Sequence, residues 1–347
     1  MQRNKDQYIE LGGNKPGLPT IAVIFTGGTI SQMPDHNGIL VSALSGVELV
    51  RNHPVIRDIA RIKLVEYSNI DSIQMHPSHW LQISKIANNF LRQPDIAGVV
   101  IVHGTDTMVE GAYFLDLTID SKKPVVFTGA MKDAANNSFD GIANLYDAMM
   151  QAISKEAYNW GVTITLNQYV NSARDVYKMH STNRQAFCSG EKGYLGYIER
   201  GKVRRFRDRI DKLYIPLPKE QLAEVALIKT YAGDDGSLLS AAVAAKFQGI
   251  VIEGFGSGSV NLSVSKAINY AISKKTPVVV TSETCNGGVD PVYGSAGGSA
   301  ALKKLGAILG EDLSGNKARL LLMLLLSTGV LKKDLGKHFS CEQKSVQ

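Results

Sequence analysis

One short segment, residues 99–108, constrains the fold of this chain more than any other. Its first half, Val99–Val102, is entirely apolar and β-branched, which is typical of a strand buried on both faces of a parallel sheet. Gly104 then permits a sharp turn, and Thr105 and Asp106 are residue types that begin helices. The segment therefore predicts a hydroxyl and a carboxylate at the carboxyl end of a parallel strand, where open α/β sheets bind ligands.

A purely structural interpretation also exists, because Thr and Asp often only cap helices. Glu110 follows three residues after Thr107, so the spacing predicts a capping box. A second segment favours function, because residues 21–30 repeat the design of an apolar strand, a glycine pair and Thr29. Two such strand ends in one chain are hard to explain as two accidental caps.

Length and composition indicate an ordinary globular protein of two domains. The chain has 347 residues, of which 44% are hydrophobic and 20% are charged. Its formal charge of +6 is concentrated in residues 200–212. A nucleic acid is one possible partner for that segment, but Glu199, Asp208 and Asp211 interrupt it, which favours a solvated hairpin surface and no nucleic-acid partner.

Targeting and redox signals favour a cytoplasmic protein with no membrane association. The three cysteines have no metal-ligand spacing and suggest no disulfide framework. Residues 1–20 have no apolar core, so no secretory signal is expected. The apolar run Leu320–Leu326 is too short to span a bilayer and predicts a buried helix or an oligomer contact.

Strands and helices alternate through most of the chain, which predicts βαβ units and parallel sheets. In the first half, strands are expected near 21–25, 62–67, 98–102, 124–128 and 161–166, and helices near 44–52, 78–92, 106–119 and 139–154. A β-hairpin is expected at 193–198 and 202–204. In the second half, strands are expected near 225–229, 249–253 and 277–281, and helices near 237–247, 260–273, 298–309 and 315–327.

These elements predict a two-domain α/β architecture. The expected parts are an N-terminal leader at 1–20, a catalytic α/β domain at 21–212, a proline-containing linker at 213–224 and a C-terminal α/β domain at 225–347. The larger N-terminal domain is expected to hold a mostly parallel, Rossmann-like sheet with the β-hairpin. The C-terminal domain is expected to be a smaller α/β unit.

The candidate chemical groups are hydroxyls and one lysine at strand ends. Thr29 needs a base to become a nucleophile, and the preceding glycine pair can direct backbone N–H groups at an oxyanion or a phosphate. Lys178 could act as a base beside a carboxylate, although an isolated lysine is usually a surface charge and the sequence cannot place it near Thr105. Ser72 is a third strand-end hydroxyl, although it also suits a turn.

Two further motifs predict no metal and no nucleotide. His76 and His79 have helical spacing but lack a third ligand, so they indicate a helix start and no metal site. The glycine-rich segment 254–259 fits the dinucleotide fingerprint only loosely.

With these residues in view, the chain resembles the bacterial-type L-asparaginases and glutaminase-asparaginases across about residues 20–330. The similar motifs are Thr26–Ile30, His103–Met108 with Glu110, Pro124–Met131, Asp140–Leu145, Arg174–Lys178 and Gly193–Ile198. Order, spacing and predicted strand ends all agree with the family's two threonine signatures.

The resemblance implies hydrolysis of an amino-acid side-chain amide without a cofactor. Thr29 would be the acylated nucleophile, and Thr105, Lys178 and Asp106 would form a second catalytic group. Asp106 would also bind the substrate's α-ammonium, Ser72 its α-carboxylate, and the Ala130 carbonyl would lie near the amide. The expected substrate-binding set is Gly28, Asp71, Ser72, Ile73, His103, Gly104, Thr105, Asp106 and Ala130. The family assembles as tetramers of close dimers, so a homotetramer acting on a small amide is expected.

Three positions depart from the family pattern. Ile39 stands where the family has a loop Tyr that is thought to activate the nucleophile. Ile73 follows Ser72 where a polar residue is usual, and Ser259 stands where the secreted class has Asn. Another group, such as Tyr177, Lys178 or a loop residue, is therefore expected to take over activation, or turnover to be slow. Ile73 is expected to make the site less selective, or to shift it away from free asparagine.

The function expected from the sequence is that of a cytoplasmic L-asparaginase. Three alternatives remain. They are a glutaminase-asparaginase or related amidase, a paralogue that binds aspartate or asparagine with impaired catalysis, and a nucleic-acid binder that uses the basic segment at 200–212. The amidase subunit of a transamidation system is disfavoured, because the short leader cannot encode the additional N-terminal domain that such subunits carry.

Overall fold

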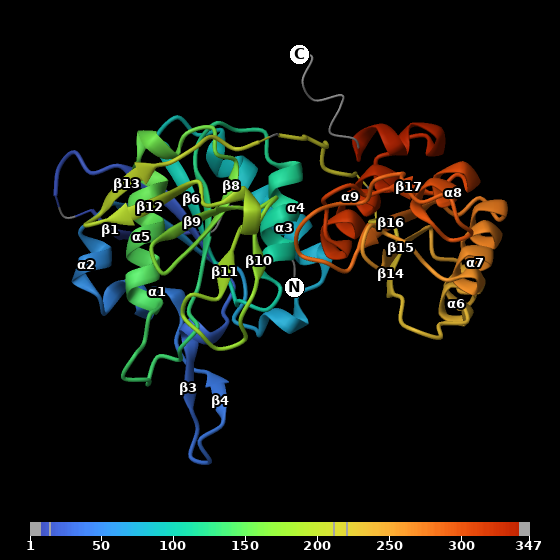
Figure 1. Ribbon diagram of the computed structural model, residues 1–347. Helices are drawn as coiled ribbons and strands as arrows, with labels where there is room; N and C mark the ends of the chain where they lie inside the picture. Colours follow the sequence, from blue (N-terminus) through green and yellow to red (C-terminus); the bar gives the residue numbers. More distant parts are fainter. Residues whose placement is uncertain (1–7, 14, 211, 220, 340–347) are drawn as a thin grey trace. The chain divides into compact units, whose positions relative to one another are not determined.

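The computed structural model describes residues 8–13, 15–210, 212–219 and 221–339 (Figure 1). The chain divides into two compact units, with the boundary between Tyr214 and Ile215. Each unit has its own sheet and its own helices, as the alternation of strands and helices predicted.

In the described part of the first unit, nine strands form one mixed sheet in the order β1-β5-β2-β6-β7-β8-β9-β12-β13. Their bounds are β1 (Ile9–Gly12), β2 (Thr20–Phe25), β5 (Arg61–Glu66), β6 (Ile96–Val102), β7 (Val125–Thr128), β8 (Val162–Leu166), β9 (Tyr169–Ser172), β12 (Gly196–Glu199) and β13 (Lys202–Arg205). The five strands from β5 to β8 run parallel, and each lies within two residues of a predicted strand. The predicted hairpin is confirmed as β12 and β13.

Helices cover both faces of this sheet. Their bounds are α1 (Gly46–Arg51), α2 (Pro54–Arg57), α3 (Pro77–Leu91), α4 (Met108–Thr118) and α5 (Gly141–Ile153). Side chains of α1, α2 and α5 form one core cluster with β2, β5 and β6, while α3 and α4 pack on the other face (Figure 1). Burial on both faces explains why the central strands are continuous apolar runs.

Two short hairpins extend from the first sheet. β3 (Gln32–Pro34) and β4 (Leu40–Ser42) form a hairpin that projects from the first unit (Figure 1). β10 (Tyr177–Lys178) and β11 (Phe187–Cys188) form the second, within the segment that joins β9 to β12. The first hairpin follows parallel strand β2 along the chain and carries Gln32, whereas the second follows antiparallel strand β9 and carries Lys178.

The described second unit has a parallel sheet in the order β14-β15-β16-β17. Its elements are β14 (Val225–Lys229), α6 (Ser237–Ala244), β15 (Gly249–Gly254), α7 (Leu262–Ser273), β16 (Val278–Ser282), α8 (Ser299–Leu305), β17 (Ile308–Leu309) and α9 (Gly315–Ser327). The apolar run in α9 is buried from Leu320 to Leu325 and packs on β14, β15 and β16. Of the two predictions for this run, a buried helix or an oligomer contact, the structure therefore shows the buried helix. No helix among the described residues is long and apolar enough to cross a membrane.

Two details differ from the sequence expectation. The helix predicted at 298–309 is wrong in its last turn, because Gly306 takes a left-handed conformation (φ 100°) that ends α8 at Leu305. Residues 308–309 then form β17. Residues 1–20 were expected to be a leader, whereas Ile9–Gly12 pair antiparallel with β5 as an edge strand.

Candidate active site

Four predicted site residues follow four neighbouring strands of the first sheet. Ser72 follows β5, Thr29 follows β2, Thr105 follows β6, and Ala130 follows β7. The chain runs from β2 outward to β5 and then crosses to β6, so the strand order reverses between β2 and β6. Thr29 and Thr105 flank this topological switch point, where doubly wound sheets bind ligands.

The two threonine segments meet through glycine backbone. Gly28 has φ 92°, and a Cβ atom placed on it would lie 2.3 Å from the Cα atom of Gly104. Only glycine permits this close approach together with a positive φ. Thr29 directly follows Gly28 and Thr105 directly follows Gly104, so each threonine lies next to this contact between the two glycines.

The structure brings Lys178 to Thr105, which the sequence could not do. The Lys178 Nζ atom donates to Thr105 Oγ1 at 3.0 Å and to Asp106 Oδ1 at 2.7 Å. Thr105 is buried, while the Asp106 side chain is 62% exposed. A hydroxyl, an ammonium and a carboxylate thus form a continuous hydrogen-bonded group that opens to solvent at its acidic end.

Ser72 links the β5 and β6 strand ends. Its buried Oγ accepts a hydrogen bond from the Asp106 backbone N–H at 3.2 Å, so its own proton remains available for another acceptor. Its carbonyl accepts from Thr107 Oγ1 at 2.8 Å. The predicted capping box of Thr107 and Glu110 is therefore wrong, because the Thr107 hydroxyl is directed at Ser72 instead.

His103 supports the Thr105 turn from the core. It is fully buried, and this burial lowers its pKa to about 4, so the ring is neutral at physiological pH. The indole N–H of Trp80 donates to Nε2 at 3.3 Å. The proton therefore sits on Nδ1, which donates to the Gly104 carbonyl at 2.7 Å.

The turn after β7 is held by the start of α5. Ala130 is buried, and Asp140 accepts hydrogen bonds from the backbone N–H groups of Met131 and Lys132. Asn144 Nδ2 donates to the Gly129 carbonyl and to Asp140. The motif at 140–145 thus orients the strand end that carries Ala130.

Two other predicted residues lie beside Ser72. Asp71 Oδ1 accepts from Gln32 Nε2 at 2.5 Å, which ties the Ser72 turn to the β3–β4 hairpin. Ile73 is 65% exposed. The sequence reasoning missed Gln32, Trp80 and Asn144 as supporting residues. The only available signal was the Asp140–Leu145 motif, because the other two contacts depend on tertiary packing.

The basic segment at 200–212 is largely paired with carboxylates. Its described ion pairs are Arg204 with Glu199, Arg205 with Asp208, Arg207 with Asp175, Arg209 with Asp116, and Lys212 with Asp120. This pairing removes much of the free positive charge that phosphate binding requires.

His76 and His79 form a helix cap. His76 is the N-cap of α3, and its backbone N–H donates to His79 Nδ1 at 2.9 Å. Among the described residues, no group of three or more His, Cys, Asp or Glu side chains is arranged to hold a metal ion.

A doubly wound sheet with threonines after the two strands beside its switch point, and a lysine hydrogen-bonded to one of them, is typical of an α/β enzyme that uses an activated hydroxyl. The family profile described as "Asparaginase, N-terminal" matches residues 20–211, and that described as "Glutaminase/Asparaginase C-terminal domain" matches residues 224–339. The chain belongs to the asparaginase family.

Named relatives and a solved structure agree with this membership. The chain is 34% identical to L-asparaginase of Bacillus licheniformis, over 89% of this chain and 95% of the relative. It is 36% identical to L-asparaginase 2 of Escherichia coli, over 89% of each. A crystal structure described as a probable cytoplasmic L-asparaginase from Campylobacter jejuni superposes with a TM-score of 0.84 at 38% identity, covering 92% of this chain and 99% of that one.

Proposed function

We propose that this enzyme hydrolyses the side-chain amide of L-asparagine to L-aspartate and ammonia. The observation that carries the proposal is the Lys178 ammonium held between Thr105 Oγ1 and Asp106 Oδ1 at the sheet's switch point. The names of the relatives, which are L-asparaginases, support the same activity.

In the proposed mechanism, Thr29 Oγ1 attacks the amide carbon and transfers its proton to a neighbouring base. The C–N bond breaks, and the nitrogen leaves as ammonia after taking up a proton. Water then adds to the acyl carbon, and the ester bond between that carbon and Thr29 Oγ1 breaks. The water oxygen becomes part of the product carboxylate, one water proton returns to Thr29 Oγ1, and the other is released. The group of Thr105, Lys178 and Asp106 moves the proton in these steps, and no cofactor is needed.

The substrate's two charged groups are proposed to bind Asp106 and Ser72. The exposed Asp106 carboxylate suits an α-ammonium, and the free proton of the Ser72 hydroxyl suits an α-carboxylate. Gly28, Asp71, Ile73, His103, Gly104 and Ala130 complete the proposed pocket. Glutamine is the second candidate substrate, because exposed Ile73 leaves a position without a polar side chain that could select the shorter amide.

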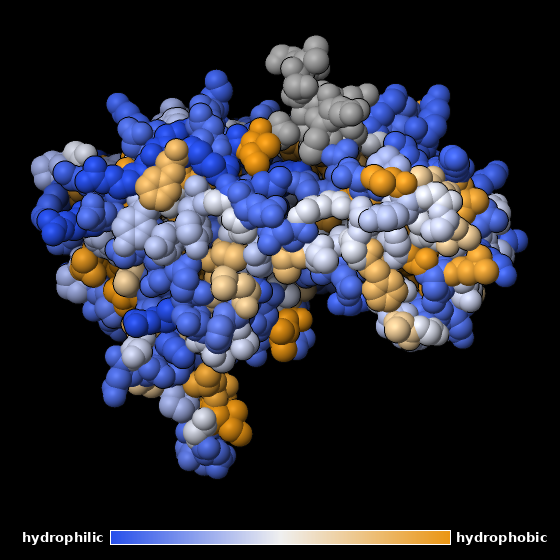
Figure 2. Space-filling view, viewed as in Figure 1, coloured by the Kyte–Doolittle hydropathy of each residue, from blue (hydrophilic) through white to orange (hydrophobic). Residues whose placement is uncertain are grey.

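A binding protein with impaired catalysis is the competing function. It is favoured by Ile39, which is 62% exposed on the β3–β4 hairpin and carries no hydroxyl. Figure 2 shows apolar side chains along this hairpin. Tight aspartate binding without ammonia release would support the competing function.

The test is ammonia release from L-asparagine and L-glutamine by the purified protein, by Thr29→Ala and by Thr105→Ala. Release from asparagine that falls by about 10³-fold or more in both variants is expected. Wild-type-like turnover in Thr29→Ala would contradict the nucleophile assignment. A sharp preference for free asparagine over glutamine and asparaginyl peptides would contradict the role of Ile73.

Assembly and location are proposed from the family resemblance. We propose a homotetramer of close dimers, and we propose the cytoplasm as its location. The location alone is supported by the description of the Campylobacter jejuni structure as a probable cytoplasmic L-asparaginase. One relative, from Haemophilus influenzae, is named a probable periplasmic L-asparaginase. Light scattering on the purified protein and cell fractionation test the two proposals separately.

A further inference from the structure

Lys178 lies on an excursion from the sheet. The excursion consists of residues 173–194, which leave the sheet after β9 and return before β12. Its regular structure is a short 3₁₀ helix at Gly190–Lys192 and the two-residue pairing of β10 with β11, which the Met179 N–H bond to the Ala186 carbonyl extends at 2.7 Å. So short a pairing is marginal alone, and the position of Lys178 therefore depends on how the excursion is anchored.

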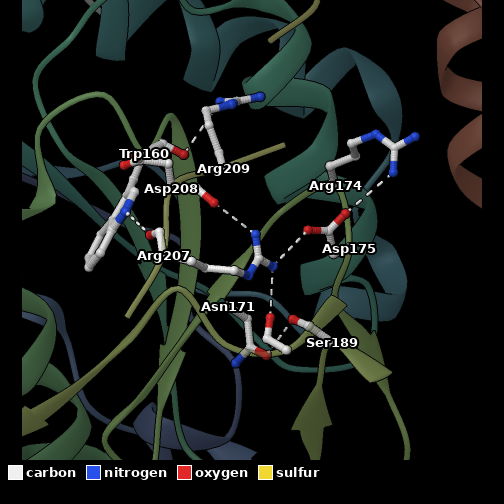
Figure 3. A network of polar contacts seen from close by, with 9 residues as sticks. Trp160, Asn171, Arg174, Asp175, Ser189, Arg207, Asp208 and Arg209 are labelled. Carbon is white, nitrogen blue, oxygen red and sulfur yellow. Dashed lines mark hydrogen bonds and ion pairs between the residues drawn. The ribbon is translucent and has the colours of Figure 1, made fainter. Parts of the chain in front are cut away.

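One guanidinium nitrogen holds both ends of this excursion. Arg207 Nη2 donates to Asp175 Oδ2 at 3.1 Å on the outgoing end and to the Gly193 carbonyl at 2.8 Å on the returning end. Arg207 Nη1 donates to the Asp208 carbonyl at 2.9 Å. Figure 3 shows Arg207 and Arg174 approaching the Asp175 carboxylate from different sides.

Arg207 is itself fixed to the sheet. Its carbonyl accepts from the Trp160 indole N–H at 3.1 Å, and its backbone N–H bonds to the Leu195 carbonyl. Its Nε is buried without a hydrogen-bond partner among the described residues. The Arg207 side chain therefore adopts a position in which both Nη atoms donate hydrogen bonds while Nε makes none with a described residue.

Asp175 links the position of Arg207 to that of Lys178, which lies three residues further along the chain. Its side chain is only 1% exposed, and its backbone N–H and that of Val176 both bond to the Ser172 carbonyl at the end of β9. β10 begins two residues later. A buried carboxylate held by two cations and a tight turn has little freedom, because moving it would leave charge unpaired in the interior.

We propose that Arg207 is a positioning residue for Lys178, acting through Asp175 and the Gly193 carbonyl. The proposal rests on the proposed function, in which Lys178 moves the proton. Arg207 touches none of the proposed reacting groups; it holds both ends of the excursion so that the Lys178 ammonium meets Thr105 and Asp106.

The experiment compares Arg207→Met with Arg209→Met. Arg209 is two residues further along the chain and makes a buried, bidentate ion pair with Asp116 of α4. Arg209→Met therefore removes a buried ion pair, as Arg207→Met does, but its partner lies on α4 and not in the excursion. Asp175 keeps Arg174 at 3.3 Å in the Arg207 variant, which favours folding. In Arg207→Met, kcat for asparagine is expected to fall on the order of 10- to 100-fold, more than KM rises. Arg207→Lys is expected to restore part of this loss.

Two further measurements separate positioning from general destabilisation. In a Lys178→Met background, adding Arg207→Met is expected to cost no further activity, because the residue through which Arg207 acts is gone. Hydrogen exchange in residues 173–194 is expected to quicken by about tenfold or more in Arg207→Met but not in Arg209→Met.

Folded Arg207→Met with wild-type kcat, or losses that multiply in the double variant, would overturn the proposal. A wild-type protein that releases no ammonia would instead contradict the proposed function. The exchange comparison would then still decide the positioning, because unchanged exchange in Arg207→Met would overturn it without any activity measurement.

Discussion

Lys178 Nζ and Thr105 Oγ1 lie 3.0 Å apart although 73 residues separate them in the chain. The contact joins an excursion of the antiparallel half of the first sheet to the end of its central parallel strand. It makes the proposed chemistry depend on tertiary structure, and it supplies the first prediction.

Lys178→Met is expected to lower kcat for asparagine by on the order of 10²- to 10⁴-fold, because the variant removes the group that is proposed to exchange protons with Thr105. Stopped ammonia assays at saturating substrate measure the loss. Lys202→Met, which removes an exposed lysine from β13, is the matched control and should retain wild-type kcat. Equal activity in the two variants would contradict the assignment.

Gly28→Ala is expected to reduce both stability and activity. A Cβ at Gly28 meets the Gly104 backbone, which cannot move aside as a flexible side chain could. Gly38→Ala is the matched control, because Gly38 also has a positive φ (79°) but has open space around its Cβ position. The control should cost about 1–2 kcal/mol of unfolding free energy from the backbone conformation alone. Gly28→Ala should cost more, and similar values in urea titrations would argue against the close contact.

His103 is expected to make the first unit less stable as pH falls. Its pKa is lowered to about 4 when folded, against 6.5 as its ordinary value, so below pH 6.5 the unfolded chain takes up a proton that the folded chain does not. Between pH 7.5 and 5 the free energy of unfolding should lose about 2 kcal/mol from this group. Tryptophan fluorescence during urea unfolding reports on the first unit, because both tryptophans lie in it. His103→Asn should lack this loss, whereas His36→Asn, at an exposed position, should retain it.

Asp147 is expected to make the first unit less stable as pH rises, which is opposite to the effect of His103. Burial in α5 raises its pKa to about 7, from an ordinary value of 3.8. Above pH 3.8 the unfolded chain loses this proton first, so stability falls as pH rises toward 7. The stability gained by Asp147→Asn should therefore grow by on the order of 3 kcal/mol between pH 5 and 8, as measured by urea unfolding. Asp120→Asn, at an exposed position, should show no such growth. A pH-independent difference for Asp147→Asn would contradict the raised pKa.

The strand and helix pattern of both units was predictable because it rests on local periodicity and on burial. Four of the five parallel strands of the first sheet, β2, β6, β7 and β8, are mostly apolar runs without a charged residue, whereas β5 carries Arg61, Lys63 and Glu66. Thr29 and Thr105 follow two of the apolar runs. The edge strand Ile9–Gly12 and the two-residue β17 were not predictable, because segments so short carry too little pattern.

The candidate site residues could be proposed from the sequence, but their contacts could not be predicted from it. Lys178 could be named from the sequence as a possible base, but no spacing relates it to Thr105, so their contact could not be predicted from the residues alone. The Thr107 capping box failed because Ser72, distant in sequence, competes for the same hydroxyl. The basic segment showed its charge in the sequence but not its partners, such as Asp116 and Asp175, which come from distant elements.

The contact between Gly28 and Gly104 has a consequence for protein engineering. It joins the Thr29 segment to the Thr105 segment through main chain alone, so no choice of side chain at Gly28 or Gly104 can compensate for a shift in the other segment. Libraries that randomise one of these segments while the other is kept constant will therefore sample mostly inactive proteins. Redesign of substrate preference is better directed at Ile73 and at the β3–β4 hairpin, where exposed side chains can change without disturbing this main-chain junction.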